Sequence, residues 1–107
     1  MSEYRFVYIT ASDEAEAARI GEALVRERLA ACANVLPGVR SFYWWEGEVQ
    51  DGREAVLILK TQAALVDRLV QKVQSLHSYS CPCVVALPIE NGNPDFLRWI
   101  GSETAQR

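Results

Sequence analysis

The sequence has little positive charge and no long apolar segment. Its 11 Lys and Arg residues are outnumbered by 14 Asp and Glu residues, which gives a formal net charge of −3. A protein without excess positive charge offers no general attraction to phosphate backbones or anionic lipids, so we expect neither nucleic acid nor a membrane as a partner. No apolar run approaches the ~20 residues of a membrane-spanning helix.

The N-terminus lacks the features of an export signal. The stretch MSEYRFVYITASDE has no basic start, no uninterrupted apolar middle and no small-residue cleavage site, so we expect the protein in the cytoplasm. The chain has three cysteines, and an odd number in such a protein favours reduced thiols over a disulfide framework.

The length and composition indicate one folded domain over residues 1–107. Half of the residues are apolar and 23% are charged, which is typical of a packed globular protein. Hydrophobic periodicity, capping residues and turn residues then predict the order βαββαβ with a further helix. The expected elements are a strand at 3–11, a helix at 14–30 capped by Ser12 or Asp13, a strand at 32–49 interrupted at Pro37-Gly38, a strand at 53–61, a helix at 61–77 capped by Thr61, a strand at 81–91 and a helix at 94–100.

A hairpin is expected at Asp51-Gly52, because this pair tolerates the positive φ of a two-residue turn. In that register Trp45 lies opposite Ile58, and the next pairs are Trp44 with Leu59 and Tyr43 with Lys60.

The element order predicts an α+β protein with a ferredoxin-like fold, in which two helices cover one face of a four-stranded antiparallel sheet. The strand segments FVYI, FYWW, VLIL and VVAL do not alternate apolar and polar residues, so both faces of the sheet are expected to be buried. Further copies of the chain would cover the second face. The alternative is that the last helix and residues 32–41 fold over it.

Several long motifs resemble the CutA family of divalent-cation tolerance proteins. They are LAACANVLPGVRSFYWWEGEV, VLILKT, LH.Y..P at 76–82 and ALPIENGNPDFLRWI. The resemblance implies a ferredoxin-like subunit in a homotrimer with a layout similar to PII signalling proteins. It also implies a role in tolerance of copper and other divalent metals, with copper binding and no enzymatic activity.

One segment departs from the family pattern. The common family form is His-Pro-Tyr-Glu-x-Pro-Glu, whereas residues 77–83 read His-Ser-Tyr-Ser-Cys-Pro-Cys. Two carboxylates are therefore absent and two thiols are present, so a family role that depends on those glutamates does not carry over.

The metal-ligand candidates are His77, Cys81, Cys83 and Cys32. On a strand, Cys81 and Cys83 would leave the same face with Cβ atoms roughly 6–7 Å apart, and thiolates with an imidazole suit Cu(I) or Zn(II). Other readings stay open. The cysteines can be buried packing residues or a redox pair, and His77 can serve the C-terminus of a helix.

A second candidate site is a cleft between subunits with Tyr43, Trp45, Lys60 and Tyr79. A lysine among aromatic residues needs a partner, which we expect to be an anionic ligand or one of Glu46, Glu48 and Glu90. Alternatively, its ammonium group reaches solvent.

The sequence therefore predicts a non-enzymatic, cytoplasmic homotrimer that binds copper or another divalent metal. The first alternative is a PII-like sensor that binds an anionic small molecule at the inter-subunit clefts. The second is a thiol oxidoreductase that uses Cys81 and Cys83.

Overall fold

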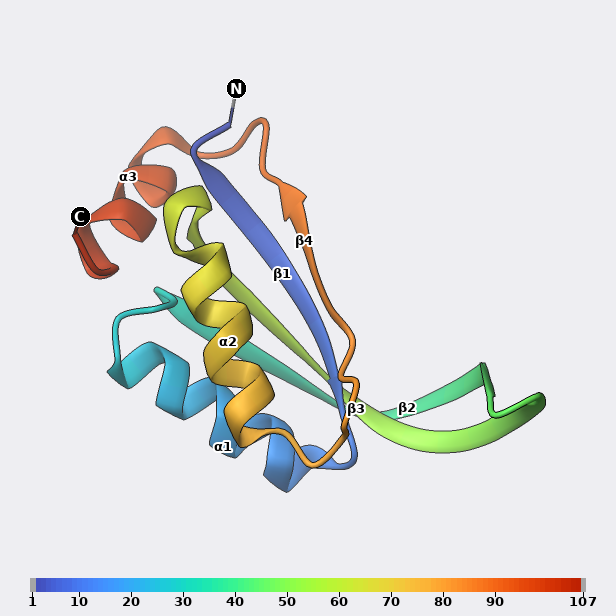
Figure 1. Cartoon of the computed structure of the whole chain (residues 1–107). Helices are drawn as coiled ribbons and strands as arrows, with labels where there is room; N and C mark the ends of the chain where they lie inside the picture. Colours follow the sequence, from blue (N-terminus) through green and yellow to red (C-terminus); the bar gives the residue numbers. More distant parts are fainter. Residues whose placement is uncertain (1, 107) are drawn as a thin grey trace.

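The computed structural model describes residues 2–106 and contains the predicted succession of elements (Figure 1). Within these residues, none of the helices combines the length and apolar character that crossing a bilayer requires. The elements in chain order are β1 (Tyr4–Ala11), α1 (Glu14–Arg26), β2 (Cys32–Trp45), β3 (Glu48–Gln62), the 3-10 helix η1 (Ala63–Leu65), α2 (Val66–Leu76), β4 (Val84–Pro88) and α3 (Pro94–Glu103).

The four strands form one antiparallel sheet in the order β2-β3-β1-β4. The two central strands are first and third in the sequence, and each half of the chain contributes a helix between its strands. This is the ferredoxin-like arrangement. Figure 1 shows α1 and α2 on the same side of the sheet, with the β2–β3 hairpin extending beyond the body of the subunit.

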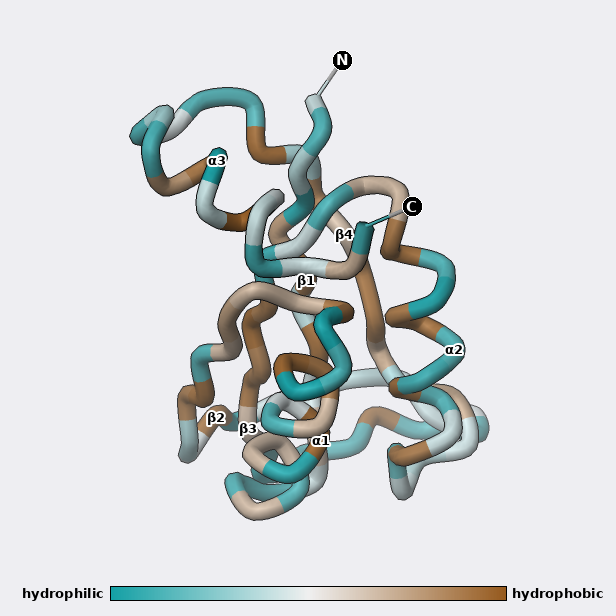
Figure 2. The backbone as a smooth tube through the Cα atoms, turned by 90° about the vertical axis from the view of Figure 1, so that its left-hand side faces the viewer, coloured by the Kyte–Doolittle hydropathy of each residue, from teal (hydrophilic) through white to brown (hydrophobic). Residues whose placement is uncertain are grey.

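The core lies between the sheet and these two helices. In Figure 2 hydrophobic and hydrophilic colours alternate along α2, as expected for a helix with one buried side. Gly21 of α1 packs closely on Leu57, since a Cβ at this glycine would lie 2.9 Å from Leu57 Cδ1. The fully buried core residues shared by the sheet and these helices are Val7, Ile9, Ala11, Ala17, Ile20, Leu24, Leu57, Leu59, Leu69 and Val73.

The predicted cap Asp13 of the first helix is confirmed, and the last helix begins at Pro94 as predicted. Asp13 Oδ1 accepts a hydrogen bond from Glu16 N at 2.9 Å, and Asn93 Oδ1 accepts one from Asp95 N at 3.0 Å. Pro94 occupies the first turn of α3, where a missing N–H costs no helical hydrogen bond.

The predicted hairpin turn is wrong. The turn lies at Glu46-Gly47, where both residues have positive φ, 52° and 82°. Trp45 therefore pairs with Glu48 rather than Ile58, and Tyr43 pairs with Gln50 rather than Lys60. Asp51-Gly52 instead lies inside β3.

The irregularity at Pro37-Gly38 is confirmed. The β2–β3 register shifts between Leu36 and Val39, and Gly38 has a φ of 73°, which favours glycine. The strand continues on both sides of this bulge, so β2 bends without ending.

The predicted cap Thr61 belongs to a strand. β3 continues to Gln62, and the Thr61 hydroxyl is buried and donates to the Leu29 carbonyl at 2.7 Å. The helix begins only at Val66 after a 3-10 turn. β4 is also shorter than expected, because it begins at Val84 and so excludes both Cys81 and Cys83.

The second face of the sheet has no helical cover from residues 2–106. Phe6 and Tyr8 of β1 alternate with the buried core residues, and their β4 partners Leu87 and Val85 are 54% and 50% exposed. On β2, Leu36 is 45% exposed. We call this surface the helix-free face.

The last helix does not supply that cover. α3 packs near the end of β3, where Gln62 Nε2 donates to Thr104 Oγ1 at 2.6 Å. We considered the alternative that α3 and residues 32–41 shield the second face. This alternative is wrong, since the aliphatic groups of the helix-free face remain exposed.

Candidate functional site

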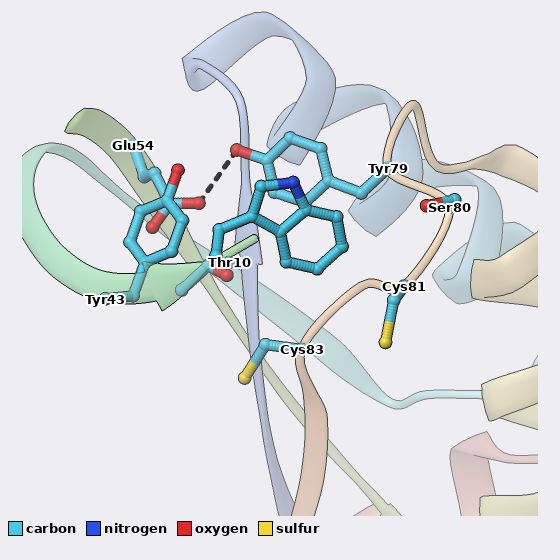
Figure 3. Close-up of a pocket in the computed structure, with 8 residues that line it drawn as sticks. Thr10, Tyr43, Glu54, Tyr79, Ser80, Cys81 and Cys83 are labelled. Carbon is cyan, nitrogen blue, oxygen red and sulfur yellow. Dashed lines mark hydrogen bonds between the residues drawn. The ribbon is translucent and has the colours of Figure 1, made fainter. Parts of the chain in front are cut away.

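A pocket of about 370 Å³ lies where the hairpin meets the segment between α2 and β4 (Figure 3). The strands supply Thr10, Tyr43, Trp45 and Glu54. The segment before β4 supplies Tyr79, Ser80, Cys81 and Cys83. A pocket of this volume is suited to a small ligand.

Glu16 anchors the segment before β4 to the start of α1. Its carboxylate accepts hydrogen bonds from the backbone N–H and the hydroxyl of both Ser12 and Ser78, at 2.7 to 3.0 Å. Burial by itself would raise the pKa of Glu16, but these four donors outweigh burial and lower it to about 2. Besides its place in the first turn of α1, Glu16 therefore fixes the approach to the pocket.

His77 holds the same segment from the other side. Its side chain is fully buried, Nδ1 accepts a hydrogen bond from Tyr79 N at 3.0 Å, and Nε2 lies 2.8 Å from the Thr10 carbonyl. Because Nδ1 accepts, the proton is on Nε2, which donates to Thr10. Both ring nitrogens are therefore occupied, and neither has a free lone pair for a metal ion.

Tyr79 extends from this anchor into the pocket and donates to Glu54 Oε2 at 2.8 Å (Figure 3). Burial raises the pKa of the Tyr79 phenol well above its usual range, and the hydrogen bond to Glu54 and the charge of that carboxylate raise it further. The phenol therefore remains a proton donor at any physiological pH.

Cys81 and Cys83 lie at the rim of the pocket, in the irregular segment before β4. Both residues are exposed in the single chain and unpaired as disulfides, so they are not part of the core of the subunit. The prediction that they lie on a strand is also wrong, because β4 begins one residue after Cys83. Figure 3 places the two thiols at the opposite end of the pocket from the Glu54–Tyr79 hydrogen bond.

The pocket unites some of the predicted site residues and leaves others outside. Tyr43, Trp45 and Tyr79 of the predicted cleft line it together with Cys81 and Cys83. Lys60, Cys32 and His77 do not line it.

Lys60 lies elsewhere on the helix-free face. Its Nζ donates to Asn34 Oδ1 at 2.7 Å and lies 3.7 Å from Cys32 Sγ. Lys60 was expected to pair with Glu46, Glu48 or Glu90, but its partner is Asn34. Cys32 is half-buried beside this lysine, apart from the other two cysteines.

Glu54 is the functional residue that sequence reasoning missed. It is only 9% exposed and shares the pocket with Tyr79, which is 25 positions later in the chain. A carboxylate that directly precedes the apolar run AVLIL of a strand is a signal that could have drawn attention to it.

The described residues, 2–106, contain no group of three or more His, Cys, Asp or Glu side chains arranged to hold a metal ion. Two exposed thiols in one pocket are what the chain offers a soft metal.

Comparison with known proteins gives matches over most of the chain. Residues 5–103 match the family model described as CutA1 divalent ion tolerance protein. The chain is 45% identical over 98 residues to the divalent-cation tolerance protein CutA of Thermus thermophilus, covering 92% of this chain and 95% of that protein. It is 42% identical over 100 residues to the chloroplastic protein CutA 1 of Oryza sativa, covering 94% of this chain and 56% of that protein.

Solved structures agree with these matches. The crystal structure of CutA1 from Oryza sativa superimposes with a TM-score of 0.95 at 40% identity, covering 99% of this chain and 97% of that one. The periplasmic divalent cation tolerance protein CutA of Archaeoglobus fulgidus gives a TM-score of 0.90 at 40% identity, covering 94% and 97%.

Proposed function

The chain belongs to the family of CutA1 divalent ion tolerance proteins, and from this premise we propose that it is a non-enzymatic homotrimer that binds copper or another soft metal ion. The observation that carries the proposal is the pair of exposed thiols in one pocket. Thiolates are soft ligands that favour Cu(I) and also bind Zn(II). The first ligands are therefore Cys81 and Cys83.

The other predicted ligands fit less well. His77 donates from Nε2 and accepts at Nδ1, so it acts by positioning Thr10 and Tyr79. Cys32 lies beside Lys60, whose positive charge disfavours a nearby metal cation. The proposed ion is consequently bound by two thiolates of one chain, and any further ligand comes from outside the pocket.

The homotrimer is supported by the helix-free face. Leu36, Val85 and Leu87 are each 45–54% exposed on that face of a single chain, and a soluble protein rarely leaves such a set of aliphatic groups in water. Other copies of the chain cover the face in the proposed assembly. The pocket opens on the same side, since its strand residues Tyr43 and Glu54 point there, and so lies at a subunit boundary.

The alternative function, a sensor of an anionic small molecule, finds less support in the charges of this pocket. Lys60 is hydrogen-bonded to Asn34 outside it, and Glu54 contributes a negative charge inside it. A cytoplasmic location remains part of the proposal.

A metal titration of the reduced protein tests the function. Cys81→Ser and Cys83→Ser are expected to weaken Cu(I) binding by at least about tenfold each, because each removes one of two soft ligands. Cys32→Ser is the matched control, since it makes the same chemical change away from the pocket, and it should bind as the unaltered protein does. Competition with a Cu(I) chelator of known affinity provides the measurement.

Equal affinities in all four proteins would discard the assignment to these thiols. A loss confined to Cys32→Ser would move the site to the opposite end of the helix-free face.

A further inference from the structure

The pocket contains a carboxylate with no cationic partner. Glu54 is 9% exposed and its hydrogen bond comes from the neutral phenol of Tyr79. Among residues 2–106, no Lys, Arg or His nitrogen lies within 4.0 Å of its oxygens. A largely buried negative charge is stabilised when a cation pairs with it.

The pocket also has aromatic walls. Tyr43, Trp45 and Tyr79 all line it, and Tyr79 is held by the hydrogen bond from its N–H to His77 and by contact between the two rings, whose centroids are 4.7 Å apart. Figure 3 shows the Glu54 carboxylate next to the ring of Tyr43 in this view, with its hydrogen bond to the Tyr79 hydroxyl. Aromatic faces attract cations through the ring quadrupole.

These features argue against an anion or a hard metal ion at this end of the pocket. None of the eight lining residues is basic, so an anion would meet only the charge of Glu54. A hard metal ion requires several oxygen ligands, whereas the pocket has a single carboxylate. The thiols lie at the other end, so the chemistry beside Glu54 does not depend on them.

We infer that the pocket binds a small organic ammonium cation, with Glu54 as the charge partner and Tyr43, Trp45 and Tyr79 as an aromatic enclosure. The cation sits where it contacts the carboxylate and the ring faces at once, and the pocket volume of about 370 Å³ accommodates a ligand of this size. This binding goes beyond metal tolerance and requires neither cysteine.

Calorimetric titration of the assembled protein with choline tests the inference. The control ligand is 3,3-dimethyl-1-butanol, which has nearly the same shape without the charge. The unaltered protein should prefer choline by about tenfold or more, since only the charged ligand gains from the carboxylate and the ring faces.

Two substitutions locate the site. Glu54→Gln keeps the size of the side chain and its ability to accept from Tyr79, and it should reduce the preference for choline to less than about twofold. Trp45→Leu should weaken choline binding while the charge of Glu54 remains. Glu90→Gln is the matched control, because this exposed carboxylate lies outside the pocket, and it should leave the preference unchanged.

Several results would overturn the inference. They are no choline binding by the unaltered protein at tens of millimolar, equal binding of the two ligands, or a preference that survives Glu54→Gln. A thermal melt of each variant separates loss of the site from loss of the fold.

The test of choline binding is independent of the test of metal binding. The double variant Cys81→Ser with Cys83→Ser should retain the choline preference while it loses Cu(I) binding. Loss of choline binding in that variant would show that the thiols, and not Glu54 with the rings, form the site, and would also reject the inference.

Discussion

The two faces of the sheet differ more than any other two regions of the molecule. On the helix-covered face, Val7, Ile9, Leu57 and Leu59 are completely buried by α1 and α2. On the helix-free face, apolar groups of similar size are about half exposed. A single subunit therefore buries the apolar residues of the first face and leaves those of the second face exposed.

We associate the helix-covered face with the stability of the subunit and the helix-free face with its function. The helix-covered face accounts for the closed core of the subunit. The helix-free face carries the pocket with Glu54 and the aromatic rings, and the two thiols lie at the rim of that pocket. Changes on the two faces should therefore have different consequences.

Leu57→Ala should have the largest effect, because it opens a cavity where the sheet meets Gly21 of α1. We expect a loss of about 2–5 kcal/mol in the free energy of unfolding. The matched change Leu36→Ala, at a residue that is 45% exposed in one subunit, should weaken association and cost less in the subunit itself. Urea denaturation at a fixed subunit concentration measures the first effect, and sedimentation measures the second.

Equal losses of subunit stability from Leu57→Ala and Leu36→Ala would contradict the claim that only the helix-covered face forms the core of the subunit.

Glu16→Gln should have a smaller effect that depends on pH. The pKa of Glu16 is about 2 in the folded protein and 4.5 ordinarily, so its stabilisation is fully present above pH 4.5 and is lost as the pH falls toward 2. A difference of this size corresponds to about 3 kcal/mol at neutral pH. Glu16→Gln should therefore lower stability at pH 7 by roughly 2–3 kcal/mol and by much less at pH 3.

Glu14→Gln is the control for that prediction, because Glu14 lies in the same first turn but is exposed, and it should cost under about 1 kcal/mol. A Glu16→Gln loss that is equal at both pH values would show that the carboxylate charge does not stabilise the segment before β4.

Element order was predictable from the sequence because it depends on local signals. The cap Asp13, the start of the last helix at Pro94 and the bulge at Pro37-Gly38 are formed by neighbouring residues, and all are confirmed. The hairpin register was not predictable in the same way. Glu46-Gly47 and Asp51-Gly52 both suit a turn, and the usual preference for Asp over Glu at positive φ favours the wrong pair.

The division of residues between the two faces survived that error. The expected and observed turns are five residues apart, so beyond the bulge the two paired positions still sum to an odd number, and Tyr43 and Trp45 lie on the helix-free side. Because side chains alternate along a strand, a shift of this kind changes partners without exchanging faces.

The site itself was predictable only in part. Tyr79, Cys81 and Cys83 were recognised as chemically distinctive, but their placement depends on contacts made by Glu16 and His77 with distant parts of the chain. Glu54 joins the site through a hydrogen bond across 25 positions. No local pattern encodes such a contact, and the same limit explains why His77 was predicted as a ligand although both of its nitrogens are engaged.

Sedimentation equilibrium of the unaltered protein at low micromolar concentration tests most directly whether the helix-free face is an interface between copies. The account predicts one species at about three times the 12.0 kDa subunit mass. A 12.0 kDa species that still melts cooperatively would show that a single chain tolerates this face in water, and would contradict the account.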